Sequence, residues 1–278
     1  MARKQGGRSN LRDLLDLRMM PPPLIARLLG LATVLVLCLF WWLATRGATP
    51  EARFVSPVIL PAPLEVVRSM GSLWTERHLA AGIIATLRRV ITGFGLAVLV
   101  GVPLGIVAGS WRVLDAAAAP VALFGRNVPV AALIPLTILW FGIDETQKVM
   151  FIFIACVPFV FTDAARAIVS VPDRYVETAL TLGASSLQIV GKVLVALALP
   201  DIYKSLRSLF GIAFGYIMLA ELINAEHGLG YLLSTSQRRG LSEHIILILL
   251  VIGVLAFSID RFLLWLQRGI FPYRADAE

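Results

Sequence analysis

Charged side chains within long apolar runs are the residues of this chain whose chemistry is most informative. They are Arg126 in one run, Asp163 and Arg166 in the next, and Glu221 at the end of a later one. Ionised groups in such runs tend to face a bundle interior or an aqueous pathway. Asp163 and Arg166 are three residues apart and can neutralise each other on one helix face. We therefore take Arg126 and Glu221 as candidates for a substrate pathway or gate.

The residues that follow Arg126 add Asn127, Pro129 and Pro135 to the pathway candidates. Prolines inside a helix free backbone carbonyls, which either shape a pathway or only kink the helix. Two roles are open to Arg126 itself. It attracts an anionic solute, or it pairs with a carboxylate or extends to the membrane interface.

Glu221 also has two roles open to it. It lines the exit of a pathway, or it pairs with Arg238 or Arg239 further along the chain. We expect the pairing, because a carboxylate at the end of an apolar run is most simply satisfied by a nearby cation.

Residue patterns that would indicate an enzyme are missing from the sequence. Cys38 and Cys156 both lie in apolar runs, and the three histidines have no Cys, Asp or Glu at ligand spacing, so we expect no metal site. No GxSxG, HExxH or Walker A pattern occurs. The chain is therefore expected to bind no cofactor and to hydrolyse no ATP itself.

One segment between apolar runs has the pattern of two short helices. Ser170 and Asp173 resemble a capping box that begins the first helix. Gly183 supplies the left-handed residue that ends it, and one of the serines 185–186 caps the second. Pro200 is expected to end the second helix. Such a helix pair between membrane spans offers a surface to a soluble partner.

Composition places the chain in the membrane. Hydrophobic residues make up 58% and charged residues 15%, with a mean hydropathy of +0.82. The apolar surplus must face lipid, and the long unalternating runs favour helices over a barrel. The net charge of +7 suits cytoplasmic loops and lipid headgroups. We therefore expect a lipid bilayer, and no nucleic acid, as a partner.

The apolar runs predict six transmembrane helices, and the excess of Lys and Arg places both termini in the cytoplasm. The expected spans are residues 24–45, 83–109, 116–141, 148–169, 205–223 and 244–266. The chain is expected to begin with a cytoplasmic tail (1–23) and the first span (24–45). A periplasmic loop (46–82) follows, with an amphipathic helix over residues 64–79. The rest is a core of five spans (83–267), which includes the two-helix segment (170–200), and a cytoplasmic tail (268–278).

The glycines of the second span recur at intervals that favour close helix packing over a ligand role. They are Gly93, Gly95, Gly101, Gly105 and Gly109. The residues 110–115 are expected to form a short turn back into the next span, and the residues 224–243 a loop.

The two-helix segment resembles the cytoplasmic loop of permease subunits of type I ABC importers. That loop carries an EAA motif, a following glycine and a later Leu-Pro, which match Glu177-Thr178-Ala179, Gly183 and Leu199-Pro200. Thr178 departs from the motif, and Ala196 stands where many relatives have an earlier Leu-Pro. Neither change removes the helix–glycine–helix pattern.

Three further stretches resemble the nitrate, sulfonate and taurine branch of this family. They are Leu60-Pro61-Ala62-Pro63, the stretch RNVPVAALIPLTILWFGIDET over 126–146, and Ala220–Ile223 with Gly228-Leu229-Gly230. Asn127 and Val130 replace two prolines of the branch pattern. The resemblance covers most of the chain, from about residue 60 to the end.

The resemblance implies an all-α integral membrane protein with six transmembrane helices and a cytoplasmic coupling segment. The implied partners are a second permease subunit, expected to be an identical copy, a cytoplasmic ABC ATPase dimer that uses ATP and Mg, and a periplasmic substrate-binding protein. The implied coupling residues are Glu177, Thr178, Ala179, Gly183 and Pro200. The implied location is the bacterial inner membrane.

The solute is expected to be a small anion such as nitrate, a sulfonate or taurine. Bicarbonate or a vitamin precursor is the alternative, because related permeases differ in their solutes. A passive channel is a more remote alternative, since a channel has no need for a cytoplasmic docking surface.

Overall fold

A computed structural model describes residues 22–47, 49, 53–223 and 225–273, and its regular elements in these ranges are all helices. This confirms the all-α prediction. The chain divides into two compact units, Met1–Val67 and Arg68–Glu278, which are described separately.

The first unit holds one long apolar helix. Helix α1 (Pro23–Ala44) matches the first predicted span, and its exposed apolar side chains suit a helix that faces lipid. The short helix α2 (Pro63–Arg68) follows the loop. The indole Nε1–H of Trp41 donates to the carbonyl of Pro61 at 2.9 Å, which ties the end of the loop back to α1.

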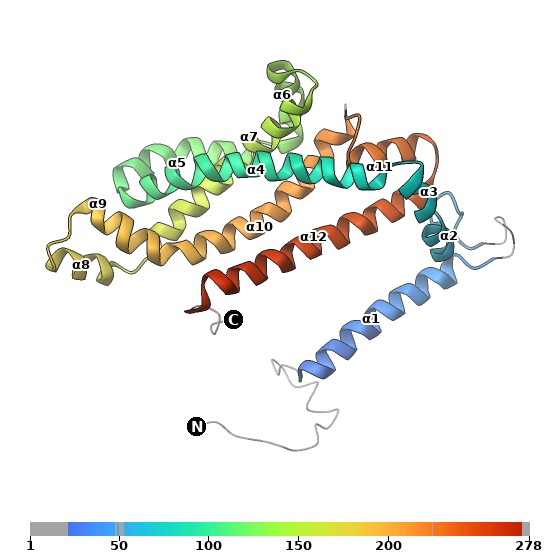
Figure 1. Cartoon of the computed structure of the whole chain (residues 1–278), viewed down its shortest axis with the longest axis horizontal. Helices are drawn as coiled ribbons and strands as arrows, with labels where there is room; N and C mark the ends of the chain where they lie inside the picture. The colour runs from blue at the N-terminus through green and yellow to red at the C-terminus, as the bar shows by residue number, and fades with distance from the viewer. Residues whose placement is uncertain (1–21, 48, 50–52, 224, 274–278) are drawn as a thin grey trace. The chain divides into compact units, whose positions relative to one another are not determined.

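The second unit is a helical bundle (Figure 1). Its elements are α3 (Met70–Thr75), α4 (Leu79–Ser110), α5 (Arg112–Asn127), the 3₁₀ turn η3 (Val130–Ala132), α6 (Leu133–Phe141), α7 (Glu145–Val169), α8 (Asp173–Thr181), α9 (Ser186–Ile189), the π-helical turn η4 (Val190–Leu194), α10 (Val195–Leu222), α11 (Leu229–Arg238) and α12 (Ser242–Ile270). In Figure 1, α8 and α9 lie at one end of this unit and α3 and α11 at the other.

The number of spans agrees with the prediction. Five helices of the described chain are long and apolar enough to cross a membrane, and the pair Arg112–Asn127 and Val130–Phe141, bent by 86°, makes a sixth if it is one span. The predicted interruption of the third span is therefore confirmed. Its cause is local, because the break contains Pro129, which has no N–H to continue the helix.

A seam of glycines brings α4 directly against α7. At each of four glycines an added Cβ would lie 2.5–2.8 Å from the nearest atom of α7; these are Gly93, Gly101, Gly105 and Gly109. Small residues allow membrane helices to approach backbone to backbone, as the sequence predicted. Gly95 is different, since its Cβ would meet nothing within 4 Å among the described residues.

The fifth span corrects one prediction, because Pro200 does not end a helix. It lies buried inside α10, and the helical path from Ser186 to Leu222 is 37 residues long. Ala198 and Ile202 pack there with Ala164 of α7. The burial of these apolar side chains opposes the cost of about 3 kcal/mol for a proline in a helix interior.

Three smaller corrections concern helix ends. Ser170 does not cap α8, because its hydroxyl donates to the Ala167 carbonyl of α7 at 2.8 Å. The predicted turn at 110–115 contains the start of α5, and only Trp111 separates α4 from α5. The predicted loop at 224–243 contains α11, and the predicted amphipathic helix at 64–79 is two short helices, α2 and α3.

Side-chain contacts fasten α10 to its neighbours along its length. Tyr203 donates its hydroxyl to the Leu263 carbonyl of α12 at 3.0 Å, and Arg207 Nε lies 2.6 Å from Asp260 of α12. On the side of α4, the rings of Phe94 and Phe210 meet edge to face at 5.4 Å.

Candidate functional site

The turn between α8 and α9 is a complete Schellman motif. Gly183 has φ of +80°, its amide donates to the Leu180 carbonyl at 2.9 Å, and the Ala184 amide donates to the Ala179 carbonyl at 3.0 Å. These two bonds satisfy the last carbonyls of α8. The structure thus confirms the left-handed glycine that the sequence predicted.

The start of α9 carries its own cap. Ser185 forms a capping box with Gln188, whose Oε1 accepts a hydrogen bond from the Ser185 amide at 2.9 Å. Both ends of the turn are therefore fixed by local hydrogen bonds, and the angle between α8 and α9 follows from the sequence of the turn.

The helix pair buries one face and exposes the other. Ala179, Ile189 and Leu194 pack with residues of α7 and α10 in a shared apolar cluster. On the other face Leu182 is 82% exposed and Leu187 is 75% exposed. Two leucines left open beside polar side chains form a surface suited to a partner.

Two residues of the predicted coupling motif lie on this open face. Glu177 and Thr178 are exposed, whereas Ala179 is buried. The Thr178 hydroxyl donates to the Arg174 carbonyl of its own helix at 2.7 Å. The departure at position 178 therefore leaves the buried face of α8 unchanged. Pro200 is not on this face, because it is buried within α10.

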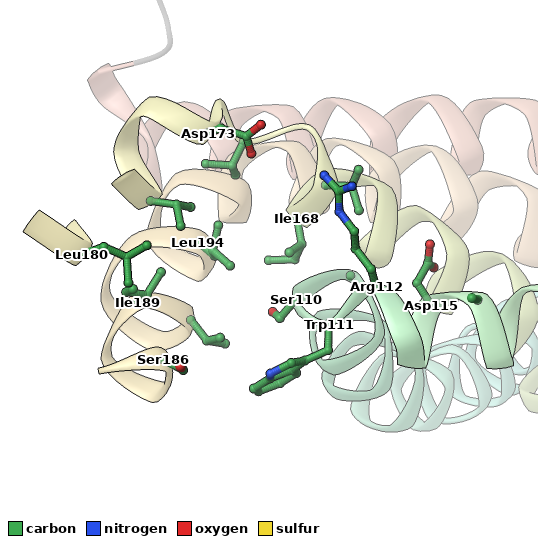
Figure 2. Close-up of a pocket in the computed structure, with 16 residues that line it drawn as sticks. Ser110, Trp111, Arg112, Asp115, Ile168, Asp173, Leu180, Ser186, Ile189 and Leu194 are labelled. Atoms are coloured by element: carbon green, nitrogen blue, oxygen red, sulfur yellow. The ribbon is translucent and has the colours of Figure 1, made fainter. Parts of the chain in front are cut away.

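A cavity of about 590 Å³ separates the helix pair from the junction of α4 and α5. Figure 2 shows Trp111, Arg112 and Asp115 on one side of it and Leu180 and Ser186 on the other. The α8–α9 pair is thus open toward this junction, and its buried cluster holds it on α7 and α10.

Arg126, at the end of α5, pairs with α7. Its Nη1 donates to the Thr162 hydroxyl at 2.6 Å and lies 3.6 Å from Asp163, and its guanidinium lies 5.0 Å from the ring centre of Phe159. The predicted pair of Asp163 with Arg166 is therefore wrong, since Asp163 faces Arg126 across the helix contact. Arg166 is exposed.

The other pathway candidates near Arg126 lie at the end of α5, in the break and in α6. Asn127 donates its side-chain amide to the Leu123 carbonyl at 2.9 Å, and Pro129 lies in the break before η3. Pro135 lies in the first turn of α6, where proline is tolerated, so it does not cause the 86° bend.

Glu221 is paired, as expected, but with a different partner. Its side chain is fully buried, and its Oε1 lies 2.7 Å from Nη1 of Arg89, which is 2% exposed. Arg238 and Arg239 are exposed at the end of α11. The prediction of these two as partners is wrong, because α11 directs its N-terminus and not its basic end at Glu221.

The sequence analysis missed Arg89, although a signal for it was present. Arg89 lies inside the second predicted span, as Arg126 lies inside the third, and the same rule about charges in apolar runs applies to both. Arg89 also bonds Glu145 of α7 through Nε at 2.8 Å and through Nη2. It thus joins three helices.

The candidate residues form three separate groups. The predicted coupling residues other than Pro200 lie at the α8–α9 end, Arg126 and its neighbours lie at the α5–α6 break, and Glu221 lies where α10 approaches α11 (Figure 1). The described residues hold no group of three His, Cys, Asp or Glu side chains that could bind a metal.

The sequence matches a known family over residues 101–272, described as binding-protein-dependent transport system inner membrane component. A similar protein is the taurine transport system permease protein TauC of Escherichia coli, 30% identical over 261 residues, which cover 90% of this chain and 91% of that protein. The bicarbonate transport system permease protein CmpB of Synechococcus elongatus is 29% identical, over 87% and 89% of the two chains.

Solved structures resemble the fold at lower sequence identity. A chain of the inward-facing MetNI methionine ABC transporter aligns with a TM-score of 0.64 at 20% identity, covering 72% of this chain and 98% of that chain. An amino acid ABC transporter crystallised with histidines gives a TM-score of 0.60 at 19% identity, covering 72% and 97%. These matches concern the fold alone.

Proposed function

Because this chain belongs to the family of binding-protein-dependent transport system inner membrane components, and is the permease of an ABC importer, we propose that its solute is a small oxyanion-bearing molecule, with taurine or another sulfonate first. The observation that carries the proposal is the match to the taurine permease over nine-tenths of this chain. Nitrate fits the same chemistry. Bicarbonate is the second candidate, favoured by the match to the bicarbonate permease.

Arg126 supports an anionic solute. Only Nη1 of its guanidinium has a bonding partner among the described residues, and its side chain is 26% exposed at the break between α5 and α6. A guanidinium has five N–H donors in a fork that fits an oxyanion. The remaining donors are thus available to a passing sulfonate or carboxylate.

Uptake into proteoliposomes tests this proposal. The full complex is reconstituted with labelled taurine, an alkanesulfonate, nitrate or bicarbonate, with and without internal ATP. We expect ATP-dependent taurine uptake that Arg126→Ala lowers about tenfold or more, the effect of losing a charge-assisted hydrogen bond. Arg166→Ala is the matched control, because Arg166 is an exposed cation on α7, three residues from the Asp163 that faces Arg126. Equal uptake by the two variants would remove Arg126 from the pathway.

We further propose that the exposed face of α8 and α9 docks the ATPase. Glu177 and Thr178 would contact it, and Ala179 and Gly183 would hold the shape of the surface. Pro200 would not touch the ATPase and would influence docking only through α10, in which it is buried. ATP and Mg would be bound and used by that partner and not by this chain.

The remaining assembly is part of the same proposal. The family is an inner membrane component, and the described chain carries several helices able to cross a membrane. We propose cytoplasmic termini, a homodimer of two copies, and a periplasmic binding protein that delivers the solute. Exposed apolar residues of α5 and α6, such as Phe124 and Leu139, offer a face to lipid or to a second copy.

A further inference from the structure

A buried polar cluster joins the far end of α10 to α11. The Glu221 carboxylate accepts hydrogen bonds from Arg89 Nη1 at 2.7 Å, from the Thr86 hydroxyl at 2.9 Å and from the Gly230 amide at 2.9 Å. Thr86 accepts in turn from the Leu229 amide at 2.9 Å. All the side chains involved are buried, so these bonds act in a medium of low polarity.

The first residues of α11 are shaped to the Glu221 carboxylate. A Cβ at Gly228, where φ is +126°, would lie 2.5 Å from the carboxylate carbon of Glu221. A Cβ at Gly230 would lie 2.7 Å from Cβ of Glu221 and 2.8 Å from the Met218 carbonyl. Backbone and carboxylate thus meet with no room for a side chain, and α11 is set directly on the end of α10.

The same cluster holds α4 and α7. Arg89 Nη1 also donates to the His227 carbonyl, at 2.7 Å, just before α11. Arg89 Nε donates to Glu145 at the start of α7. The carboxylate of Glu221 is therefore the meeting point of α10 and α11, and Arg89 extends the connection to α4 and α7.

The opposite end of the same helical path lies in the coupling segment. The path from Ser186 to Leu222 is unbroken, begins at the α8–α9 turn and passes through η4, where one turn is π-helical. π-helical turns often occur at functional positions. The α8–α9 turn and Glu221 are therefore joined by one continuous helical path.

We propose that Glu221 is a positioning residue that makes α11 follow α10, with Thr86 and Arg89 as its partners. The proposal rests on the proposed function, since the motion that α10 passes on originates at the docked ATPase. It differs from a role for Glu221 in solute contact, because Glu221 is enclosed by protein groups on every oxygen.

Hydrogen–deuterium exchange of the full chain in nanodiscs tests the connection without any partner. We expect the amides of residues 229–238 to exchange about tenfold faster or more in Glu221→Gln, because the Gly230 amide and the Arg89 guanidinium lose the buried carboxylate that accepts their hydrogen bonds. Thr86→Val is a milder second variant that keeps the charges. Thr92→Val is its matched control, since Thr92 lies on the same helix with its hydroxyl bonded to the Arg88 carbonyl. Unchanged exchange of α11 in both Thr86→Val and Glu221→Gln would overturn the proposal.

The second measurement uses the complex with its ATPase, before and after trapping with MgATP and vanadate. We expect trapping to change exchange in both α8–α9 and α11 of the wild type, and in α8–α9 alone of Thr86→Val. If exchange in α11 changes equally in the wild type and in Thr86→Val, or changes in neither, the proposal that α11 follows α10 is overturned. If α8–α9 of the wild type does not respond, the docking function fails, whereas the partner-free result still decides whether Glu221 holds α11.

Discussion

Gly183 illustrates how much one residue decides in this chain. Its φ of +80° lies in the left-handed region, and an added Cβ there would meet nothing within 4 Å among the described residues. A substitution at Gly183 therefore acts through the backbone alone and not through a clash. Such a substitution is therefore expected to alter the turn that orients α8 against α9.

Gly183→Ala is expected to weaken ATPase recruitment about 5- to 30-fold, because a non-glycine residue in this conformation costs about 1–2 kcal/mol. The measurement is a titration of the tagged permease with the ATPase in detergent. Gly191→Ala is the control, since Gly191 is also exposed and also has free space for a Cβ, but its φ is negative. Equal weakening by both variants would contradict a specific role for the turn.

The pair of Arg89 and Glu221 makes a second residue-scale prediction. Arg89→Met leaves the buried Glu221 carboxylate without its cation and is expected to destabilise the fold by about 3–5 kcal/mol, whereas Glu221→Met is expected to cost less, because Arg89 keeps its pair with Glu145. The double variant Arg89→Met with Glu221→Met is expected to be more stable than Arg89→Met alone, because no buried carboxylate is then left without its cation. Thermal unfolding of the four purified chains in one detergent measures this. Additive losses in the double variant would show that the two side chains act independently.

At the scale of elements, the contact between α4 and α7 depends on the absence of side chains. The four glycines of the seam lie one or two turns apart on one face of α4, and Gly105 makes the closest approach, to the Phe161 carbonyl. The two helices can therefore meet without interlocking side chains. Gly95, on another face, takes no part in this contact.

Gly105→Ala is expected to destabilise the bundle by about 1–3 kcal/mol, because its Cβ would lie 2.5 Å from the Phe161 carbonyl and 2.7 Å from Cβ of Ala164. Gly95→Ala is expected to leave stability unchanged or to raise it by up to about 1 kcal/mol through helix propensity. The melting temperatures of the two variants in the same detergent provide the comparison. If the Gly105→Ala chain were as stable as the Gly95→Ala chain, this prediction would be wrong, and α4 and α7 would be able to move apart at little cost in stability.

The outcome for individual elements shows which sequence signals are reliable. The spans and the Gly183 turn could be predicted because hydrophobicity and turn chemistry are local. The continuity of α10 through Pro200 could not, because it depends on packing with Ala164 of α7. The partner of Glu221 could not be predicted either, since Arg89 is 132 residues away in the sequence and two basic residues, Arg238 and Arg239, lie much nearer.

At the scale of the whole second unit, the α8–α9 pair and α11 lie at opposite ends of the bundle (Figure 1). If the termini are cytoplasmic, α8–α9 must face the cytoplasm and α11 the periplasm. The described helices have the fold of type I ABC importer permeases.

Single cysteines test this orientation. With Cys38 and Cys156 replaced, a cysteine at the exposed Gln237 should react with a membrane-impermeant maleimide in intact spheroplasts. A cysteine at the exposed Leu187 should react only after the membrane is opened. The reverse pattern would invert the assignment of the two faces.

The distance of Arg89 from Glu221 along the chain has a consequence for synthesis. At roughly 5–20 residues per second, the ribosome reaches Glu221 on the order of ten seconds after Arg89. During that interval α4 must enter the bilayer without its final counter-ion, and Glu145 is made first and is the earlier partner available. We therefore expect assembly in the membrane to be ordered, with α7 joining α4 before α10 arrives, and we expect a nascent chain stalled between these helices to hold Arg89 on Glu145 alone.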